Sequence, residues 1–184
     1  ILMKKIGDYK LIGETRDDAA GECFDKTARI LGLGYPGGPT VAAEAARYKI
    51  QNTKYKIQLP RPMMYSQDYD FSFSGLKTAV LYKVKKLKTI NYKLKTAFCA
   101  EIQQAIIDVL IYKTLKVAKD FKVRAIILGG GVAANEELRR QFEERIKKEI
   151  LNTRYIIPDT KYCTDNAAMV AVATYFNRKK ASRS

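Results

Sequence analysis

The sequence predicts an α/β protein with a mostly parallel sheet. Short apolar strand patterns alternate with longer helical patterns along the 184 residues. Hydrophobic residues make up 47% of the chain and charged residues 29%, which is typical of a globular domain. At residues 124–140 a buried-strand pattern also runs into three glycines and then directly into a charged helix. Parallel sheets of this kind bind ligands at the carboxyl ends of their strands, and three loops could meet there: the helix start at Asp18 with the GYPGGP turn, Gly129–Asn135, and Pro158–Asp165.

The N-terminal elements are predicted from one strand pattern and from the residues that end a helix. Tyr9–Arg16 is predicted to be a strand, and Asp17 or Asp18 then opens a helix. This helix ends near Leu31, because two glycines lie within the next three positions. The sequence GYPGGP, at Gly34–Pro39, predicts a rigid turn.

The middle of the chain is predicted to be mainly helical. A helix is expected over Thr40–Tyr48, followed by an irregular polar stretch. The alternating sequence DFSFS predicts a strand over Asp70–Ser74, and a helix follows over Leu76–Leu87. A helix over Thr96–Phe121 is apolar on most faces, so we expect it to lie in the core between layers.

The C-terminal part is predicted to be a strand, helix, strand and helix. Ala125–Leu128 is a short apolar strand, and Asn135 is the expected N-cap of the next helix. A strand follows over Arg154–Ile157, and Asp165 is the expected start of the last helix. The helix after Asn135 has an apolar stripe of Leu138, Phe142, Ile146 and Ile150, and its expected ion pairs are Glu136 with Arg140, Glu143 with Lys147, and Glu144 with Lys148.

The glycines Gly129–Gly131 are the first candidate site. Without a Cβ their amides can approach a ligand closely, and a following helix start favours an anion. Neither the GxGxxG nor the GK[ST] spacing of known nucleotide loops is present, so an ordinary strand-to-helix turn is the alternative. Glu136 and Glu137 would repel a phosphate there, which would then need a nearby cation.

Three other groups of residues are candidates for binding. Asp18, Glu22 and Asp25 share a helix face that either contacts a ribose or metal or is simply solvated. Gly38 and its neighbour in YPGGP allow close approach of a planar group, or merely form a turn. Asp165 is placed to cap a helix and also to serve as a hard ligand for a divalent cation.

Charge and residue usage narrow the function classes. The formal net charge is +15, from 34 Lys and Arg against 19 Asp and Glu, which favours phosphate-bearing partners. Lysines and two tyrosines without any acid occupy Lys77–Lys95, which is either an RNA-facing patch or a solvated face. There is no histidine, which excludes Ser-His and Cys-His catalysis and an HExxH peptidase site within this chain. The three cysteines fit reduced thiols, and no signal peptide or membrane span is expected, so a cytoplasmic protein is predicted.

Four segments together resemble one family. They are GETRDDAAGECFDKTARILGLGYPGGP, FSFSGLKTAV, LGGGVAANEELR and YCTDNAAMVA. They are similar to the bacterial form of the tRNA threonylcarbamoyladenosine synthesis transferases, the Gcp or TsaD group, once described as O-sialoglycoprotein endopeptidases. The resemblance covers nearly the whole chain and indicates the C-terminal part of such an enzyme.

The resemblance implies a fold and a set of roles. The fold would be that of actin, Hsp70 and sugar kinases, with ribonuclease-H-like lobes: residues 1–17 would end the N-terminal lobe's sheet, 18–178 would form the C-terminal lobe with a helical insertion, and 179–184 would be a frayed tail. Asp25, Gly38, Gly130 and Asn135 match substrate-binding positions, and Asp165 matches a metal ligand. No catalytic residue is assigned.

The implied activity is acyl transfer from threonylcarbamoyl-AMP to the exocyclic amine of the adenosine beside the anticodon of tRNA. One divalent metal ion, iron or zinc, is implied, and so are an inactive paralogue and a small ATPase as partners. The family's metal-binding histidines are absent, so we expect the isolated chain to be inactive. The alternative is a non-catalytic adenine-nucleotide or RNA-binding module.

Overall fold

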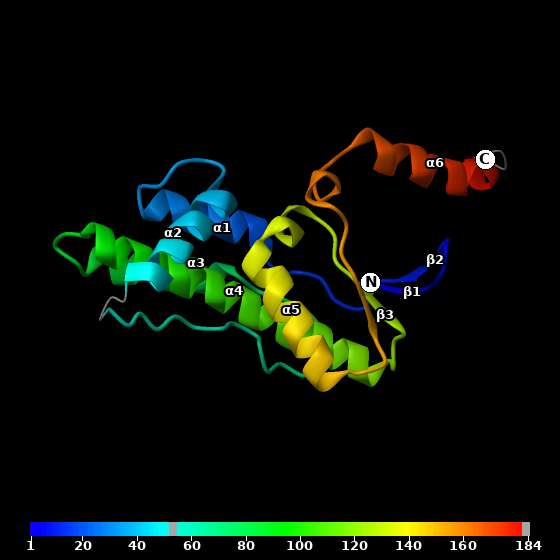
Figure 1. Cartoon of the computed structure of the whole chain (residues 1–184), viewed down its shortest axis with the longest axis horizontal. Helices are drawn as coiled ribbons and strands as arrows, with labels where there is room; N and C mark the ends of the chain where they lie inside the picture. Colours follow the sequence, from blue (N-terminus) through cyan, green and yellow to red (C-terminus); the bar gives the residue numbers. More distant parts are fainter. Residues whose placement is uncertain (52–54, 182–184) are drawn as a thin grey trace.

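The computed structural model describes residues 1–51 and 55–181, without the side chains of residues 49–51 and 179–181. It is a mixed α/β protein, as the sequence predicts, and helices α1–α4 lie at one end of it, with β1, β2 and α6 at the other (Figure 1). The predicted mostly parallel sheet is not formed by the described residues, whose strands make two separate pairs, β1–β2 antiparallel and β3–β4 parallel. In chain order the elements are β1 (Leu2–Lys5), β2 (Asp8–Lys10), α1 (Ala20–Ile30), α2 (Gly37–Gln51), α3 (Ser74–Lys85), α4 (Tyr92–Asp120), β3 (Ala125–Ile127), η1 (Gly131–Ala134), α5 (Glu136–Glu149), β4 (Arg154–Ile156), η2 (Thr160–Tyr162) and α6 (Ala167–Ala181).

Helix α4 is the centre of the fold and is shared by two hydrophobic clusters. It is 29 residues long and starts before the predicted Thr96, because Asn91 Oδ1 accepts the amide of Leu94 at 2.8 Å and caps it. Phe98, Ile102 and neighbouring residues pack against α1, α2 and α3. Ile107, Ile111, Leu115 and Ala118 pack against β3 and α5. The prediction of a core helix between layers is confirmed.

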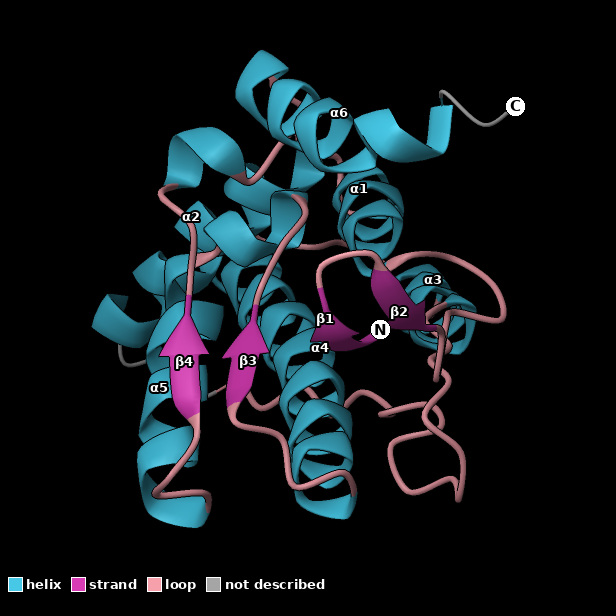
Figure 2. Cartoon of the chain, turned by 90° about the vertical axis from the view of Figure 1, so that its right-hand side faces the viewer, coloured by secondary structure: helices cyan, strands magenta, loops and turns pink. Residues whose placement is uncertain are grey.

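The β3–α5–β4 unit forms the second layer. β3 and β4 pair in parallel, with Ile126 opposite Tyr155, and Figure 2 shows the two arrows side by side and pointing the same way. The predicted apolar stripe of α5 is confirmed, since Leu138, Phe142 and Ile146 are buried against α4. Of the predicted ion pairs Glu143–Lys147 forms, but Arg140 pairs with Glu137 and Glu144 instead.

Two predicted strands are wrong in extent. Tyr9–Arg16 is not one strand, because Gly7, at φ +84°, closes an antiparallel hairpin whose second strand, β2, ends at Lys10. The strand expected over Asp70–Ser74 is reduced to a single parallel bridge between Thr15 and Phe71. Ser74 is already helical, because the carboxylate of Asp17 accepts the amides at the start of α3.

Helix α2 begins inside the stretch predicted to be a rigid turn. Its first residue is Gly37 rather than Thr40, and the carboxylate of Asp25 accepts the Gly37 amide at 2.7 Å. The first amides of a helix lack partners within the helix, so a carboxylate from α1 stabilises this start. The PGGP sequence thus supplies a helix N-terminus as well as a turn.

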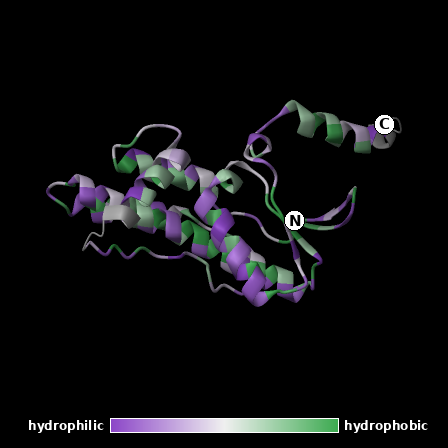
Figure 3. Cartoon of the chain, viewed as in Figure 1, coloured by the Kyte–Doolittle hydropathy of each residue, from purple (hydrophilic) through white to green (hydrophobic). Residues whose placement is uncertain are grey.

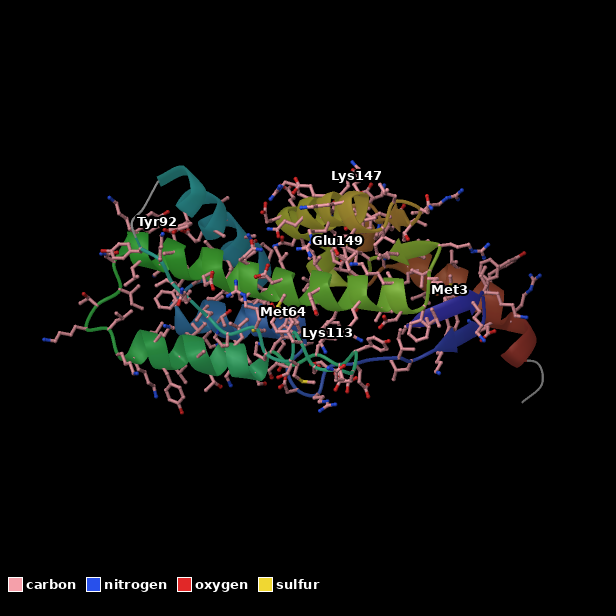
Figure 4. All side chains as sticks on the ribbon, turned by 90° about the horizontal axis from the view of Figure 1, so that it is seen from below. Met3, Met64, Tyr92, Lys113, Lys147 and Glu149 are labelled. Carbon is pink, nitrogen blue, oxygen red and sulfur yellow. The ribbon has the colours of Figure 1, made fainter. Side chains whose placement is uncertain are left out.

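The irregular segment before α3 is held against α4 by partly buried ion pairs and by one buried lysine. Arg61 forms ion pairs with Glu101 and, at 2.8 Å, with Asp108. Further along α4, Lys113 is only 1% exposed, and its ammonium donates to Ser66 Oγ, to Asp68 and to the carbonyl oxygen of Asp70. Figure 4 shows Lys113 on the side of α4 that faces this segment. The loop is therefore an ordered part of the fold.

Apolar side chains remain exposed around α6 and the small sheets. Ile127 and Ile156 are 57% and 46% exposed, and Met169, Val172 and Phe176 of α6 are all about half exposed or more. Figure 3 shows hydrophobic residues along α6. The predicted frayed tail, 179–184, overlaps the last turn of α6, and residues 182–184 lie outside the described part. None of the described helices is both long enough and apolar enough to cross a lipid bilayer.

Candidate functional site

The glycine loop lies at the carboxyl end of β3, where a parallel sheet presents its ligands. The β3–β4 pairing continues one residue beyond the strands, since the Leu128 amide donates to Ile156 at 3.1 Å. The next three residues, Gly129–Gly131, are all exposed, and a Cβ built on any of them meets no atom within 4 Å. Gly130 has φ +83°, a conformation that L side chains rarely adopt. The loop therefore presents open backbone to solvent.

The helix does not follow these glycines directly, which corrects the prediction. A short 3-10 helix, η1, comes first, because the Ala133 amide donates to the Gly130 carbonyl. Helix α5 starts only at Glu136. Asn135 is its N-cap, as predicted, and its Oδ1 accepts the Leu138 amide at 2.9 Å. The helix start that lies nearest the glycines therefore belongs to η1 and not to α5.

Asn135 also fixes the loop to the central helix. Its Nδ2 donates to Oε1 of Gln103 on α4 at 2.9 Å, and Gln103 is 6% exposed. Both polar ends of the Asn135 side chain are thus bound within the protein. A direct ligand contact by Asn135 stays a prediction, and its observed contacts hold the loop in place. Nothing in the sequence pairs Gln103 with a residue 32 positions away.

Arg139 connects the glycine loop to the loop that precedes α6. Its Nε donates to the carbonyl of Ala133 in η1. Its Nη2 donates to the carbonyl of Pro158 at 3.0 Å and lies 3.1 Å from Sγ of Cys163. One guanidinium therefore joins two of the three loops that we expected to meet. Sequence reasoning missed Arg139, although its place one turn after the N-cap Asn135 was a usable signal.

The third loop, at the start of α1, contacts the same region. A Cβ built on Gly21 would lie 3.5 Å from Cγ2 of Val132 in η1. The first turn of α1 therefore packs on the glycine loop. The expectation that these loops gather at one edge is confirmed for α1, η1 and the segment around Pro158.

Asp25 and Gly38 lie at the start of α2. The Oδ1 atom of half-buried Asp25 holds the Gly37 amide, so Asp25 has a structural role whatever ligand it contacts. A Cβ on Gly37 would lie 2.6 Å from the Asp25 Cα atom, whereas a Cβ on Gly38 meets nothing within 4 Å. Gly37 is therefore required by packing. Gly38 faces open space, as a residue beside a ligand would.

The expected acidic face is largely neutralised inside the protein. Lys26 binds Asp18 at 2.6 Å and Glu22 at 2.8 Å. Asp18 is 9% exposed, and its second oxygen, Oδ2, is buried without a hydrogen-bond partner among the described residues. Asp25 is bound to the start of α2 instead of joining this pair. The three carboxylates do not act together as one ligand set.

Asp17, which the site prediction did not include, joins α1 to α3. It accepts the Phe73 and Ser74 amides at 2.8 and 3.2 Å and the hydroxyl of Ser72 at 2.5 Å. Burial alone would raise the pKa of Asp17, but the hydrogen bonds outweigh burial and lower its pKa below the ordinary value. Asp17 is therefore a long-range helix cap.

Asp165 is exposed and does not cap the last helix, which corrects another prediction. The cap is Asn166, whose Oδ1 accepts the Met169 amide at 2.8 Å, and α6 begins at Ala167. The carboxylate of Asp165 is thus left for other contacts. No group of three or more His, Cys, Asp or Glu residues that could hold a metal ion occurs in the described residues. The residues present do not by themselves form a metal site.

The cysteines are buried, unpaired thiols, as expected of reduced residues. Burial raises the pKa of both Cys23 and Cys99 to about 12. A thiol with such a pKa stays protonated near neutral pH and is a poor nucleophile. Neither residue is a candidate for covalent catalysis.

An open glycine loop at the end of a parallel strand, held from three sides, is typical of the α/β proteins that bind phosphate-bearing ligands. Comparison with known proteins narrows this class. The model of the TsaD family, described as tRNA N6-adenosine threonylcarbamoyltransferase, matches residues 1–172, and the chain belongs to this family.

Curated relatives bear the same description. The chain is 48% identical over 180 residues to the tRNA N6-adenosine threonylcarbamoyltransferase of Thermosipho africanus, covering 98% of this chain and 52% of that protein. It is 52% identical over 166 residues to the Thermosipho melanesiensis protein, covering 90% of this chain and 48% of that one. For the Desulfotalea psychrophila protein the identity is 46% over 178 residues, covering 95% and 50%. The chain therefore spans about half the length of these relatives.

Proposed function

We propose that this chain supplies the adenylate-binding half of a tRNA threonylcarbamoyltransferase. Its substrates would be threonylcarbamoyl-AMP and the adenosine next to the anticodon of a tRNA. Membership of the family supports this activity. The parallel β3–α5–β4 unit with a glycine loop at its ligand edge is what one lobe of the actin, Hsp70 and sugar-kinase fold would contribute.

The observation that carries the proposal is the open glycine loop with its fixed base. The backbone of Gly129–Gly131 is exposed, while Arg139 and the Asn135–Gln103 hydrogen bond hold the residues immediately behind it. Donors that are already in place need no reorganisation when charge develops on a ligand. These amides would hold the phosphate of the adenylate.

The proposed transfer is an attack on the threonylcarbamoyl group of the bound adenylate. The exocyclic amine of the adenosine attacks the carbonyl carbon of the threonylcarbamoyl group, and a new C–N bond forms. The bond from that carbon to the phosphate oxygen breaks, and AMP leaves with the electron pair. The amine gives up one proton, which passes to solvent. Amides of the loop would stabilise the negative charge that grows on the AMP phosphate. No general base is assigned to the described residues.

The remaining predicted site residues would bind the nucleoside. Gly38 has open space around it, so a ribose or base could approach the start of α2 closely. The second carboxylate oxygen of Asp25 would accept a hydroxyl, while Oδ1 continues to hold Gly37. Asn135 would act mainly by positioning the loop.

We propose that a divalent metal, iron or zinc, is bound in part by Asp165, which is the one residue of this chain proposed as a ligand. This exposed carboxylate would provide one oxygen ligand, and the described residues assemble no larger ligand set. The other ligands would come from the remainder of the enzyme. An inactive paralogue and a small ATPase are the proposed protein partners.

A chimeric enzyme tests the proposal. The half of the Thermosipho africanus protein that matches this chain is replaced by residues 1–184, and transfer to unmodified tRNA is measured with threonylcarbamoyl-AMP. We expect the chimera to modify tRNA and the 184-residue chain alone to be inactive.

Two matched variants sharpen the test. Asp165→Ala in the chimera should abolish transfer while AMP binding persists, whereas Asp159→Ala, a nearby exposed carboxylate, should leave transfer unchanged. A folded chimera that binds AMP and tRNA but never transfers the group would favour a non-catalytic nucleotide- and RNA-binding module.

A further inference from the structure

A basic surface lies at the tip of the α3–α4 helical hairpin, far from the small sheets. In Figure 4, Tyr92 marks this end of α4 and Met3 lies toward the opposite end of the molecule. We call this surface the basic tip, and it consists of exposed residues at the end of α3, in the connecting loop and at the start of α4: Tyr82, Lys83, Lys85, Lys86, Lys88, Tyr92 and Lys93.

The lysines of the basic tip are not neutralised by the protein. None of them forms an ion pair with a described residue, and no acid occurs anywhere from Lys77 to Lys95. This stretch carries seven lysines, so it holds +7 of the formal net charge of +15. The excess charge of the chain is therefore concentrated rather than spread evenly.

The charged residues of α5, unlike the lysines of the basic tip, are mostly paired with one another. This helix has five acids and five bases, and Arg140, Arg145 and Lys147 each bind a glutamate within 2.7 Å. Near the end of α4, Lys116 and Lys119 are likewise paired, with Asp120 and Glu149. Exposed lysines elsewhere, such as Lys4, Lys5, Lys10 and Lys122, also form no ion pair with a described residue, so the basic tip is distinguished by how closely its unpaired lysines are grouped along the chain.

Two tyrosines lie among these lysines. Tyr82 is 60% exposed and Tyr92 is 49% exposed. The Tyr92 hydroxyl accepts a hydrogen bond at 3.3 Å from Arg47, whose guanidinium is already paired with Glu44 and therefore adds no free charge to the basic tip. Aromatic faces among unpaired cations suit the bases and phosphates of nucleic acid, because bases stack on aromatic rings and cations neutralise the backbone.

The position of the basic tip relative to the glycine loop also fits a long ligand. Gln103, which holds Asn135, lies eleven residues after Tyr92 on α4, which is about 16 Å along a helix axis at 1.5 Å per residue. An RNA whose reacting base is at the glycine loop would thus have a neighbouring stem within reach of the basic tip.

We propose that the basic tip is a docking surface for the phosphate backbone of tRNA. This inference rests on the proposed function, which makes tRNA the substrate, and it adds the surface that would bind it. The tip holds the RNA through charge and stacking, without reading its sequence. Binding at this surface is expected to orient the anticodon arm toward the glycine loop.

The test uses the 184-residue chain and an unmodified tRNA transcript in a fluorescence-anisotropy titration. One variant carries K83Q, K85Q, K86Q and K88Q. The matched control carries K4Q, K5Q, K10Q and K122Q, which removes the same charge from exposed lysines elsewhere. Circular dichroism checks that both variants are folded.

We expect the first variant to bind tRNA about tenfold or more weakly near 0.15 M salt, with the slope of log K against log salt reduced by about 3. The control should change either quantity much less. Equal losses in both variants, or no loss in the first, would overturn the proposal. A loss of binding to anionic lipid vesicles with tRNA binding unchanged would also overturn it, and would point to a membrane surface.

A second pair of variants tests stacking. Tyr82→Ala should weaken tRNA binding about fivefold or more without changing the salt slope, and Tyr82→Phe should bind normally. Equal binding by all three proteins would remove stacking from the proposal.

Failure of this proposal and of the proposed function can be told apart. The binding assay involves no transfer, whereas the chimera assay measures transfer directly. A chimera that fails to transfer, together with tRNA binding that depends on the basic tip, would leave the docking surface in place.

Discussion

Asn135 and Gln103 are joined by a hydrogen bond of 2.9 Å between Nδ2 and Oε1, and the N-cap of α5 is thereby fixed to the central helix α4. The same asparagine accepts the Leu138 amide through Oδ1. The loop behind the glycines is thus held by one side chain that acts in two directions. This double contact leads to the first prediction.

Asn135→Ala should lower the free energy of unfolding by about 1–2 kcal/mol, because the cap is lost and Gln103 loses its partner. Asn135→Asp keeps an acceptor for Leu138 but cannot donate to Gln103, so its cost should be roughly half as large. Urea denaturation followed by circular dichroism measures both. Equal losses for the two variants would mean that the cap contributes nothing.

Gly37→Ala and Gly38→Ala should differ although the residues are adjacent. A Cβ on Gly37 would lie 2.6 Å from the Asp25 Cα atom and 2.7 Å from the Phe24 carbonyl oxygen, so we expect a loss of about 1–3 kcal/mol. A Cβ on Gly38 meets nothing, and alanine favours a helix by about 1 kcal/mol. Thermal unfolding compares them. If G38A is as stable as the parent yet binds AMP more weakly, the predicted role of Gly38 is supported.

Arg139→Ala should expose the thiol of Cys163. The guanidinium contacts Cys163 and Pro158, and Cys163 is 3% exposed. In the parent protein all three thiols should react slowly with an aromatic disulfide reagent at neutral pH. In R139A one thiol should react much faster, and mass spectrometry should identify it as Cys163.

Arg140→Ala is the matched control, since its side chain contacts only α5 glutamates among the described residues. Labelling of Cys23 or Cys99 in R139A would instead indicate general unfolding, because burial keeps the pKa of both thiols at about 12.

Lys113→Met should destabilise the protein far more than Lys116→Met. Lys113 is buried, and its loss leaves the carbonyl of Asp70 and other acceptors without their donor, at a cost of about 2–4 kcal/mol. Lys116 is paired with Asp120 near the surface, where such pairs contribute about 0–1 kcal/mol. Chemical denaturation measures the difference, and similar values for the two variants would contradict the anchoring role of Lys113.

The contribution of Asp17 should depend on pH. Its hydrogen bonds lower its pKa in the folded state, so the ionised cap stabilises the protein above about pH 4. That stability is lost as the pH falls through the lowered pKa. Unfolding of the parent and Asp17→Asn proteins from pH 7 to pH 2 should therefore show a difference that shrinks in acid. A difference that stays constant over this range would exclude an electrostatic cap.

The sequence predicted the elements whose signals are local. The buried stripe of α5, the N-cap Asn135 and the core position of α4 all follow from periodicity and capping chemistry, and the structure confirms them. The predicted start of α6 was wrong because two adjacent residues, Asp165 and Asn166, are both good N-caps. The structure shows that Asn166 is the one that binds the Met169 amide.

Long-range contacts set the limits of prediction. Asp17 caps a helix whose first residue is 57 positions away, and Lys113 binds a loop more than 40 positions earlier in the chain. No spacing rule relates such residues. The strand expected over Asp70–Ser74 failed for this reason, because the amides of Phe73 and Ser74 are held by Asp17 rather than by a neighbouring strand.

Lys113 is buried whereas the lysines of the basic tip are exposed, so chemical modification of lysine can report on both regions at once. An amine-acylating reagent should modify the exposed lysines of the tip within seconds, while Lys113 should remain unmodified until the segment around Asp68 opens. In one digest, protection of the tip would then record the presence of RNA, and acylation of Lys113 would record local opening. The rate at which Lys113 is acylated would thus report how often the structure around it opens.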